Sequence, residues 1–257
     1  MSKKLLILLP LASIVALLFI KVVFSTENVS TGGAPSSGES EEDIPQPGRL
    51  TWLKNWHRPE GPVKVALQVG HWKNDELPDE LEKLKESGGS SGGGRDEWEV
   101  NLAIAKETAK ILESKGIKVD VLPATVPPSY WADVFVAIHA DGSTDISTSG
   151  FKIAAPWRDY TGRATGLVSF LEDSYQEATG LPKDENITRQ MRGYYAFSWW
   201  RYEHAIHSMT TAVIIETGFL TNPSDQKLLI ATPEIAAQGI AGGVFNYLIG
   251  EGLLNET

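Results

Sequence analysis

Five short stretches of the chain are rich in apolar, mostly β-branched side chains. They cover residues 63–69, 117–122, 133–138, 151–154 and 212–216. Such runs are typical of the inner strands of an α/β sheet, which are buried on both faces. Between them, residues 97–113, 161–179 and 233–253 carry apolar positions at helical spacing, and Asn222-Pro223 opens a further short helix at 227–230. The alternation predicts an α/β fold: a single domain with a mostly parallel central sheet flanked by helices.

Two segments interrupt this alternation. Residues 73–95 are a polar insertion, in which 77–84 favour a short surface helix and 88–94 are too rich in glycine to be regular. We expect 88–94 to be a flexible loop, and the position of the insertion makes it a candidate lid over the site. The second segment, residues 181–201, is rich in aromatic side chains and its pattern fits neither a helix nor a strand.

The N-terminus differs from the rest of the chain. Lys3 and Lys4 precede an apolar run that extends over residues 5–24 with one interruption at Lys21. Residues 1–24 therefore predict a transmembrane or signal helix, and the poor cleavage site at Val23-Phe24-Ser25 favours an uncleaved single-pass anchor. An anchor places the remainder at the extracytoplasmic face of the cell membrane, and cleavage would make it secreted.

Residues 25–62 form an acidic linker and lead-in rich in Ser, Gly and Pro, which cannot bury enough apolar surface to fold alone. We expect the aromatic side chains at its end, Trp52, Trp56 and His57, to dock on the folded domain. That domain comprises residues 63–257.

Charge and composition exclude several classes of function. A net charge of −10 argues against nucleic acid, which requires a basic surface. The chain has no cysteine, so disulfides and every cysteine-type zinc site are excluded. Any zinc must be held by histidine, carboxylate and water.

Candidate ligands follow the predicted strands. His71 comes directly after the first strand and His139 after the third, at the carboxyl ends where α/β sheets bind ligands. Glu97 opens the following helix and can face the same edge, although a first-turn glutamate is also favoured by the helix dipole, while Glu99 should point elsewhere. Glu216 ends an apolar strand, as a further ligand or a general base. Asn101 supports these residues or lies on the helix surface.

Four motifs in this order resemble the zinc-dependent N-acetylmuramoyl-L-alanine amidases of bacterial cell walls. They are VALQVGH at 65–71, EWEVNL at 97–102, ADVFVAIHAD at 132–141 and VIIETGFLTNP at 213–223. The resemblance implies that His71, Glu97 and His139 bind Zn²⁺ and that Glu216 is the catalytic carboxylate. It also implies peptidoglycan as substrate, hydrolysed between N-acetylmuramic acid and L-alanine. The chain departs from the family at Trp72, where glycine is usual, which affects substrate access more than chemistry.

Other interpretations remain open. The chain is alternatively a zinc peptidase acting on the peptidoglycan stem peptide, or a non-catalytic cell-wall binding module. His204 and His207 would lie one turn apart if their stretch is helical, and they are a structural pair, part of the substrate groove or a second candidate metal pair. The aromatic residues 194, 195, 199, 200 and 202 stack on sugar rings or pack as core. Whether a protein partner activates the enzyme is not determined by the sequence.

Overall fold

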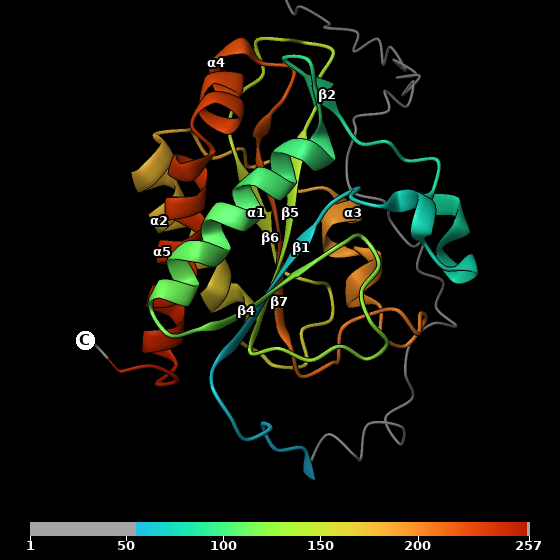
Figure 1. Cartoon of the computed structure of the whole chain (residues 1–257), viewed down its shortest axis with the longest axis vertical. Helices are drawn as coiled ribbons and strands as arrows, with labels where there is room; N and C mark the ends of the chain where they lie inside the picture. The colour runs from blue at the N-terminus through green and yellow to red at the C-terminus, as the bar shows by residue number, and fades with distance from the viewer. Residues whose placement is uncertain (1–54, 256–257) are drawn as a thin grey trace, which may run out of the picture.

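A five-stranded sheet with strand order β4-β1-β5-β7-β6 forms the centre of the structure, a computed structural model that describes residues 55–255 (Figure 1). The strands are β1 (Lys64–Val69), β4 (Lys118–Leu122), β5 (Val134–Asp141), β6 (Lys152–Ala154) and β7 (Thr211–Phe219). All neighbours are parallel except β6, which runs antiparallel to β7. The predicted α/β fold with a mostly parallel sheet is confirmed. Strands β5 and β7 each continue three residues beyond their predicted ends.

Three long helices cover one face of this sheet: α1 (Glu97–Ser114), α2 (Ala164–Thr179) and α5 (Pro233–Gly250). In Figure 1, α2 and α5 lie on the left and α1 crosses the centre of the view. Helix α1 begins at the predicted residue because Asp96 and Glu99 form a reciprocal capping box. The predicted short helix near residue 227 is α4 (Pro223–Gln226) followed by a π-helix, η6 (Lys227–Ala231). The aromatic segment contains only short helical turns, α3 (Arg189–Arg192) and η5 (Tyr195–Phe197).

Strand alternation separates two cores. In β5, Val134, Val136 and Ile138 pack toward the three helices, whereas Phe135 and Ala137 pack toward the irregular segments on the other face. By the same alternation His139 continues the row of Phe135 and Ala137. The metal-type side chains of the strands therefore lie on the face that loops and short turns cover.

The insertion is more ordered than predicted. Two 3-10 helices, η3 (Asn74–Glu76) and η4 (Asp79–Leu84), hold Leu77 and Leu81 in the second core. The expectation of a flexible loop at 88–94 is wrong for its second half, which forms a hairpin of β2 (Ser91–Gly92) and β3 (Arg95–Asp96). Its two turn residues, Gly93 and Gly94, both have positive φ, as a tight hairpin turn of type I′ requires.

Residues 1–24 and most of the linker lie outside the described residues, so the predicted membrane or signal helix is not among them. Within residues 55–255, no single helix has the length and hydropathy of a membrane span; only the bent pair 223–231 and 233–250 passes that test jointly. At the start of the described chain, Trp56 stacks on His207 and contacts Trp131 as expected, whereas His57 is exposed.

Candidate metal centre

His71 is placed by the end of β1. The N–H of Gly70 donates to the carbonyl of Ile138 at 2.9 Å, which extends the β1–β5 pairing by one residue. His71 then turns into the left-handed region with φ of 62°, an unusual conformation for a residue other than glycine and one that often marks functional sites. Gly70 has no side chain, and the imidazole of His139 fills the space where one would be.

Glu97 is fixed at the first position of α1 by donors on both carboxylate oxygens. Its Oε2 accepts from the N–H of Ser90 at 2.7 Å, and its Oε1 accepts from the N–H of Ala140 at 3.1 Å. The Nδ2 of Asn101 donates to the same Oε1 at 3.2 Å. Asn101 is fully buried, so of its two predicted roles the supporting one holds and the helix-surface one is wrong.

Three side chains from distant parts of the sequence meet here. The Oε1 of Glu97 lies 3.5 Å from the Nε2 of His71 and 3.0 Å from the Nδ1 of His139. One ligand atom from each of the three residues lies within 4.8 Å of the others, and all three residues are buried. Such a group could hold a metal ion.

The charges of this group also suit a cation. Burial alone would raise the pKa of Glu97, but His71, His139 and the N–H of Ser90 together hold that pKa below its ordinary value. Burial lowers the pKa of His139 despite the nearby Glu97 carboxylate, which favours the neutral imidazole that a metal ion requires. One carboxylate and two imidazoles are a donor set that zinc commonly takes at catalytic sites.

The residues fit a bound ion in a further respect. The Nδ1 of His71 donates to the carbonyl of Ser87 at 2.9 Å, which leaves the lone pair on Nε2. That Nε2 is buried and has no hydrogen-bond partner. Because a buried polar atom without a partner is costly, a metal ion at this position would remove an unfavourable feature of the folded protein.

Glu216 lies beside this group on the neighbouring strand. It pairs with His139 in the β5–β7 register and with Lys152 in the β7–β6 register, so the three side chains form a row on one face. The Oε2 of Glu216 is buried without a hydrogen-bond partner. Burial, and then the charges of Asp141 and Glu97, raise its pKa well above the ordinary value, and Lys152 opposes this.

A cavity of about 210 Å³ opens on Glu216 and Lys152. The ammonium of Lys152 is buried between Asp141 at 2.6 Å and Asp184 at 3.1 Å. We did not predict Lys152 as part of the site, although a single lysine in the apolar stretch 151–154 was a usable signal. Gln68, a single amide in the apolar β1 strand, was a similar signal that we did not use.

His204 and His207 do not form the second candidate metal pair. Residues 204–207 are not helical, and each histidine has a different neighbour: His204 binds the carboxylate of Glu80 at 2.7 Å, whereas His207 stacks on Trp56. Of the aromatic residues, Tyr194 and Tyr195 are buried in the second core, so for them the core interpretation is confirmed. Trp199, Trp200 and Tyr202 are only partly buried.

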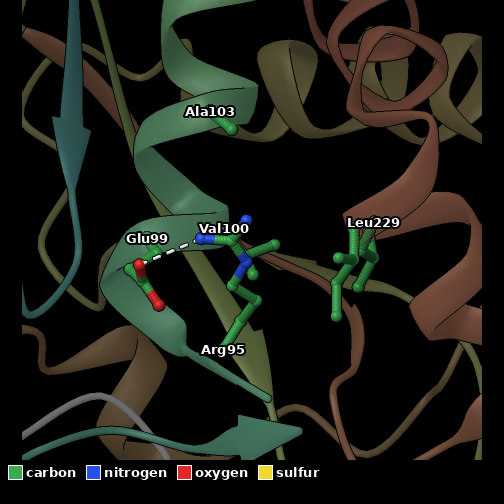
Figure 2. A pocket seen from close by; sticks show the side chains of 6 residues that line it. Arg95, Glu99, Val100, Ala103 and Leu229 are labelled. Carbon is green, nitrogen blue, oxygen red and sulfur yellow. Dashed lines mark hydrogen bonds and ion pairs between the residues drawn. The ribbon is translucent and has the colours of Figure 1, made fainter. Parts of the chain in front are cut away.

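Glu99 points away from the metal group, as predicted from its position two residues after Glu97. It accepts from Arg95 at 3.1 Å and lines a separate pocket of about 130 Å³ between the start of α1 and η6 (Figure 2). Apart from this ion pair the pocket wall is apolar, formed by Val100, Ala103, Leu229 and Ile230. The pocket offers no set of metal ligands.

Comparison with known proteins decides the family. The sequence model of the N-acetylmuramoyl-L-alanine amidases matches residues 65–246, most of the chain. The chain belongs to this amidase family. The match runs from β1 into α5 and includes His71, Glu97, His139 and Glu216.

The identity to individual amidases is low. The chain is 27% identical to the amidase AmiC of Neisseria meningitidis over 86% of its own length, and the alignment spans 59% of AmiC. It is 26% identical to AmiA of Salmonella typhimurium, covering 63% of this chain and 72% of AmiA. The catalytic domain of the amidase CwlV from Paenibacillus polymyxa has the same fold, with a TM-score of 0.52 and 23% identity over 73% of this chain and 98% of that domain.

Proposed function

We propose that this amidase-family protein is a zinc-dependent hydrolase of peptidoglycan, which cleaves the amide between N-acetylmuramic acid and L-alanine. One observation carries the proposal. A buried group of three metal-type ligands lies in register with a buried carboxylate, Glu216, whose Oε2 has no partner in the structure.

In this proposal His71, Glu97 and His139 hold the zinc, which when bound supplies the Lewis acidity that activates water and polarises the scissile carbonyl. Glu216 acts as the general base. It accepts a proton from the attacking water and later passes it to the amine of L-alanine as the C–N bond breaks. The raised pKa of Glu216 suits the first role, because it makes the carboxylate a stronger base than an ordinary glutamate.

The test compares the parent with Glu216→Gln, using Glu113→Gln as a control because that carboxylate is exposed at the far end of α1. All three proteins should bind about one zinc per chain. The parent and the control should release stem peptides from purified peptidoglycan, and Glu216→Gln should be slower by roughly 10²–10⁴-fold.

Mass spectrometry of the released fragments identifies the bond. Free stem peptides that begin with L-alanine support the amidase proposal, and cleavage within the stem would instead show a zinc peptidase. Binding of peptidoglycan without release would show a wall-binding module. Full activity of Glu216→Gln would exclude this residue as the general base.

We further propose that residues 1–24 anchor the protein at the extracytoplasmic face of the membrane and that residues 25–62 connect this anchor to the catalytic domain at 63–257. The proposal is supported by the apolar run after Lys3 and Lys4 and by the acidic linker. An anchored protein resists extraction of membranes with alkaline carbonate. Recovery of a soluble form whose sequence begins near residue 25 would instead show a cleaved signal.

A further inference from the structure

We propose that Gln68, Tyr194 and Tyr195 form a positioning relay that fixes the ring of His139, so that its Nδ1 faces the metal and its Nε2 carries the proton. The inference rests on the metal site of the proposed function and concerns residues outside the ligand set. It explains why a glutamine lies in the apolar strand β1.

The relay is a continuous chain of hydrogen bonds. The Nε2 of His139 lies 3.2 Å from the hydroxyl of Tyr194, which donates to the Oε1 of Gln68 at 2.9 Å. The Nε2 of Gln68 donates to the hydroxyl of Tyr195 at 3.0 Å and to the carbonyl of Ala124 at 3.2 Å. The hydroxyl of Tyr195 donates to the same carbonyl.

The carbonyl of Ala124 sets the direction of every bond. A carbonyl only accepts, so the amide of Gln68 must turn its NH₂ group toward it and its oxygen toward Tyr194. Tyr194 then has to donate its single hydroxyl proton to Gln68. Only the lone pairs of that hydroxyl remain for His139.

It follows that the Nε2 of His139 must be the donor. When a metal ion occupies the site the imidazole is neutral and carries one proton, so the Nδ1, which lies 3.0 Å from Glu97, is left with its lone pair.

Because the relay is buried, its hydrogen bonds cannot reverse direction without leaving a polar group unsatisfied. The exposed fractions are 0% for Gln68, 1% for His139, 1% for Tyr194 and 2% for Tyr195. No bulk water is available to satisfy a group that turns the wrong way, and each unsatisfied group costs about 1–3 kcal/mol. A histidine ligand whose second nitrogen is held in this way keeps its tautomer and ring orientation.

Each of the two histidines is thereby oriented by a group outside the ligand set, and the two groups contact different ring nitrogens. His71 is held at Nδ1 by the carbonyl of Ser87, and His139 is held at Nε2 by Tyr194. The relay also connects His139 to Gln68, three residues before His71 on the strand that delivers it. The two ligands are therefore positioned relative to a single strand.

The experiment compares the zinc-loaded parent with Tyr194→Phe, which removes the hydroxyl and keeps the ring, and with Gln68→Leu. Tyr130→Phe is the matched control, because Tyr130 donates to Asp120 at 2.7 Å away from the metal group. Zinc affinity is measured by competition with a chelator. The His139 tautomer is read from long-range ¹H–¹⁵N correlations of the zinc-loaded, histidine-labelled proteins.

We expect the parent to show His139 with zinc on Nδ1 and a proton on Nε2 that exchanges slowly with solvent. Tyr194→Phe and Gln68→Leu should bind zinc about 10–100-fold more weakly than the parent, and Tyr130→Phe should match the parent. Excess zinc should restore most of the lost turnover without changing KM, which a general loss of structure would not do.

Two results would overturn the relay: a parent with zinc on the Nε2 of His139, or unchanged zinc affinity in both relay variants. The first needs only the parent, so it stands even where a variant does not fold. A parent that binds zinc but does not hydrolyse peptidoglycan would contradict the proposed function and leave the relay supported.

Discussion

Gly70 illustrates how closely single residues determine this site. A Cβ at position 70 would overlap the imidazole of His139, whereas a Cβ at Gly88, in the same region of the chain, meets nothing within 4 Å. We therefore expect Gly70→Ala to displace His139 and weaken zinc binding by about 10–100-fold, and Gly88→Ala to bind zinc like the parent. Chelator competition measures both. Equal affinities for the two variants would mean that His139 moves without affecting the metal.

Glu216 should make the stability of the metal-free protein depend on pH. Burial raises its pKa in the folded state above the ordinary value of 4.5, so the folded protein keeps a proton that the unfolded chain releases. Stability attributable to this group is therefore complete below about pH 4.5 and is lost as pH rises toward the folded-state pKa. The glutamine in Glu216→Gln does not ionise, so that variant lacks this pH-dependent contribution to stability.

The corresponding prediction concerns chelator-treated protein. The free energy of unfolding of Glu216→Gln minus that of the parent should become more positive as pH rises from 4 to 7. Urea unfolding at a series of pH values measures this difference, and Glu113→Gln should follow the parent throughout. A difference that stays constant over this range would show that the folded-state pKa of Glu216 is not raised.

Among the helices, α2 and α5 approach closely because α5 carries glycine where α2 crosses it. A Cβ on Gly243 would lie 2.7 Å from the Cα of Leu171 and 2.9 Å from the carbonyl oxygen of Phe170. Gly243→Ala should therefore lower the free energy of unfolding by about 1–3 kcal/mol. Gly166→Ala, on the exposed side of α2 with nothing within 4 Å, should raise it by about 0.5–1 kcal/mol. Denaturant unfolding that gave both changes the same sign would contradict this packing.

The strands and long helices could be predicted because each follows a local period. Apolar runs identified β1, β5 and β7, and the residues that end them, His71, His139 and Glu216, meet at one sheet edge because parallel strands end there together. The hairpin at 91–96 was missed because glycine content alone does not separate a loop from a type I′ turn. The contacts that Lys152, Gln68 and Tyr194 make at the site were missed because they join distant parts of the chain, such as Tyr194 and Gln68, 126 residues apart.

In the molecule as a whole, the chain enters at the end of the sheet opposite the metal group. Arg58 binds Asp133, directly before β5, at 2.6 and 2.9 Å, whereas His139 lies near the other end of that strand. His139 is six positions after Asp133 along the strand, a distance of about 20 Å. Figure 1 shows the lead-in at the bottom and the β2 hairpin near the top. The described chain therefore begins at the end of the sheet that lies away from the metal group.

This separation predicts that docking of the lead-in stabilises the domain without affecting the site. Trp56 stacks on His207 with ring centroids 5.8 Å apart and lies 6.2 Å from Trp131, so Trp56→Ala should lower the free energy of unfolding by about 1–3 kcal/mol. Zinc affinity should not change, because the rings that Trp56 contacts belong to neither the metal group nor the residues that hold it. His57, next to Trp56 in the sequence, is exposed, so His57→Ala should change neither the free energy of unfolding nor the zinc affinity. A fall in zinc affinity that accompanied the loss of stability in Trp56→Ala would show that the two ends of the sheet are coupled.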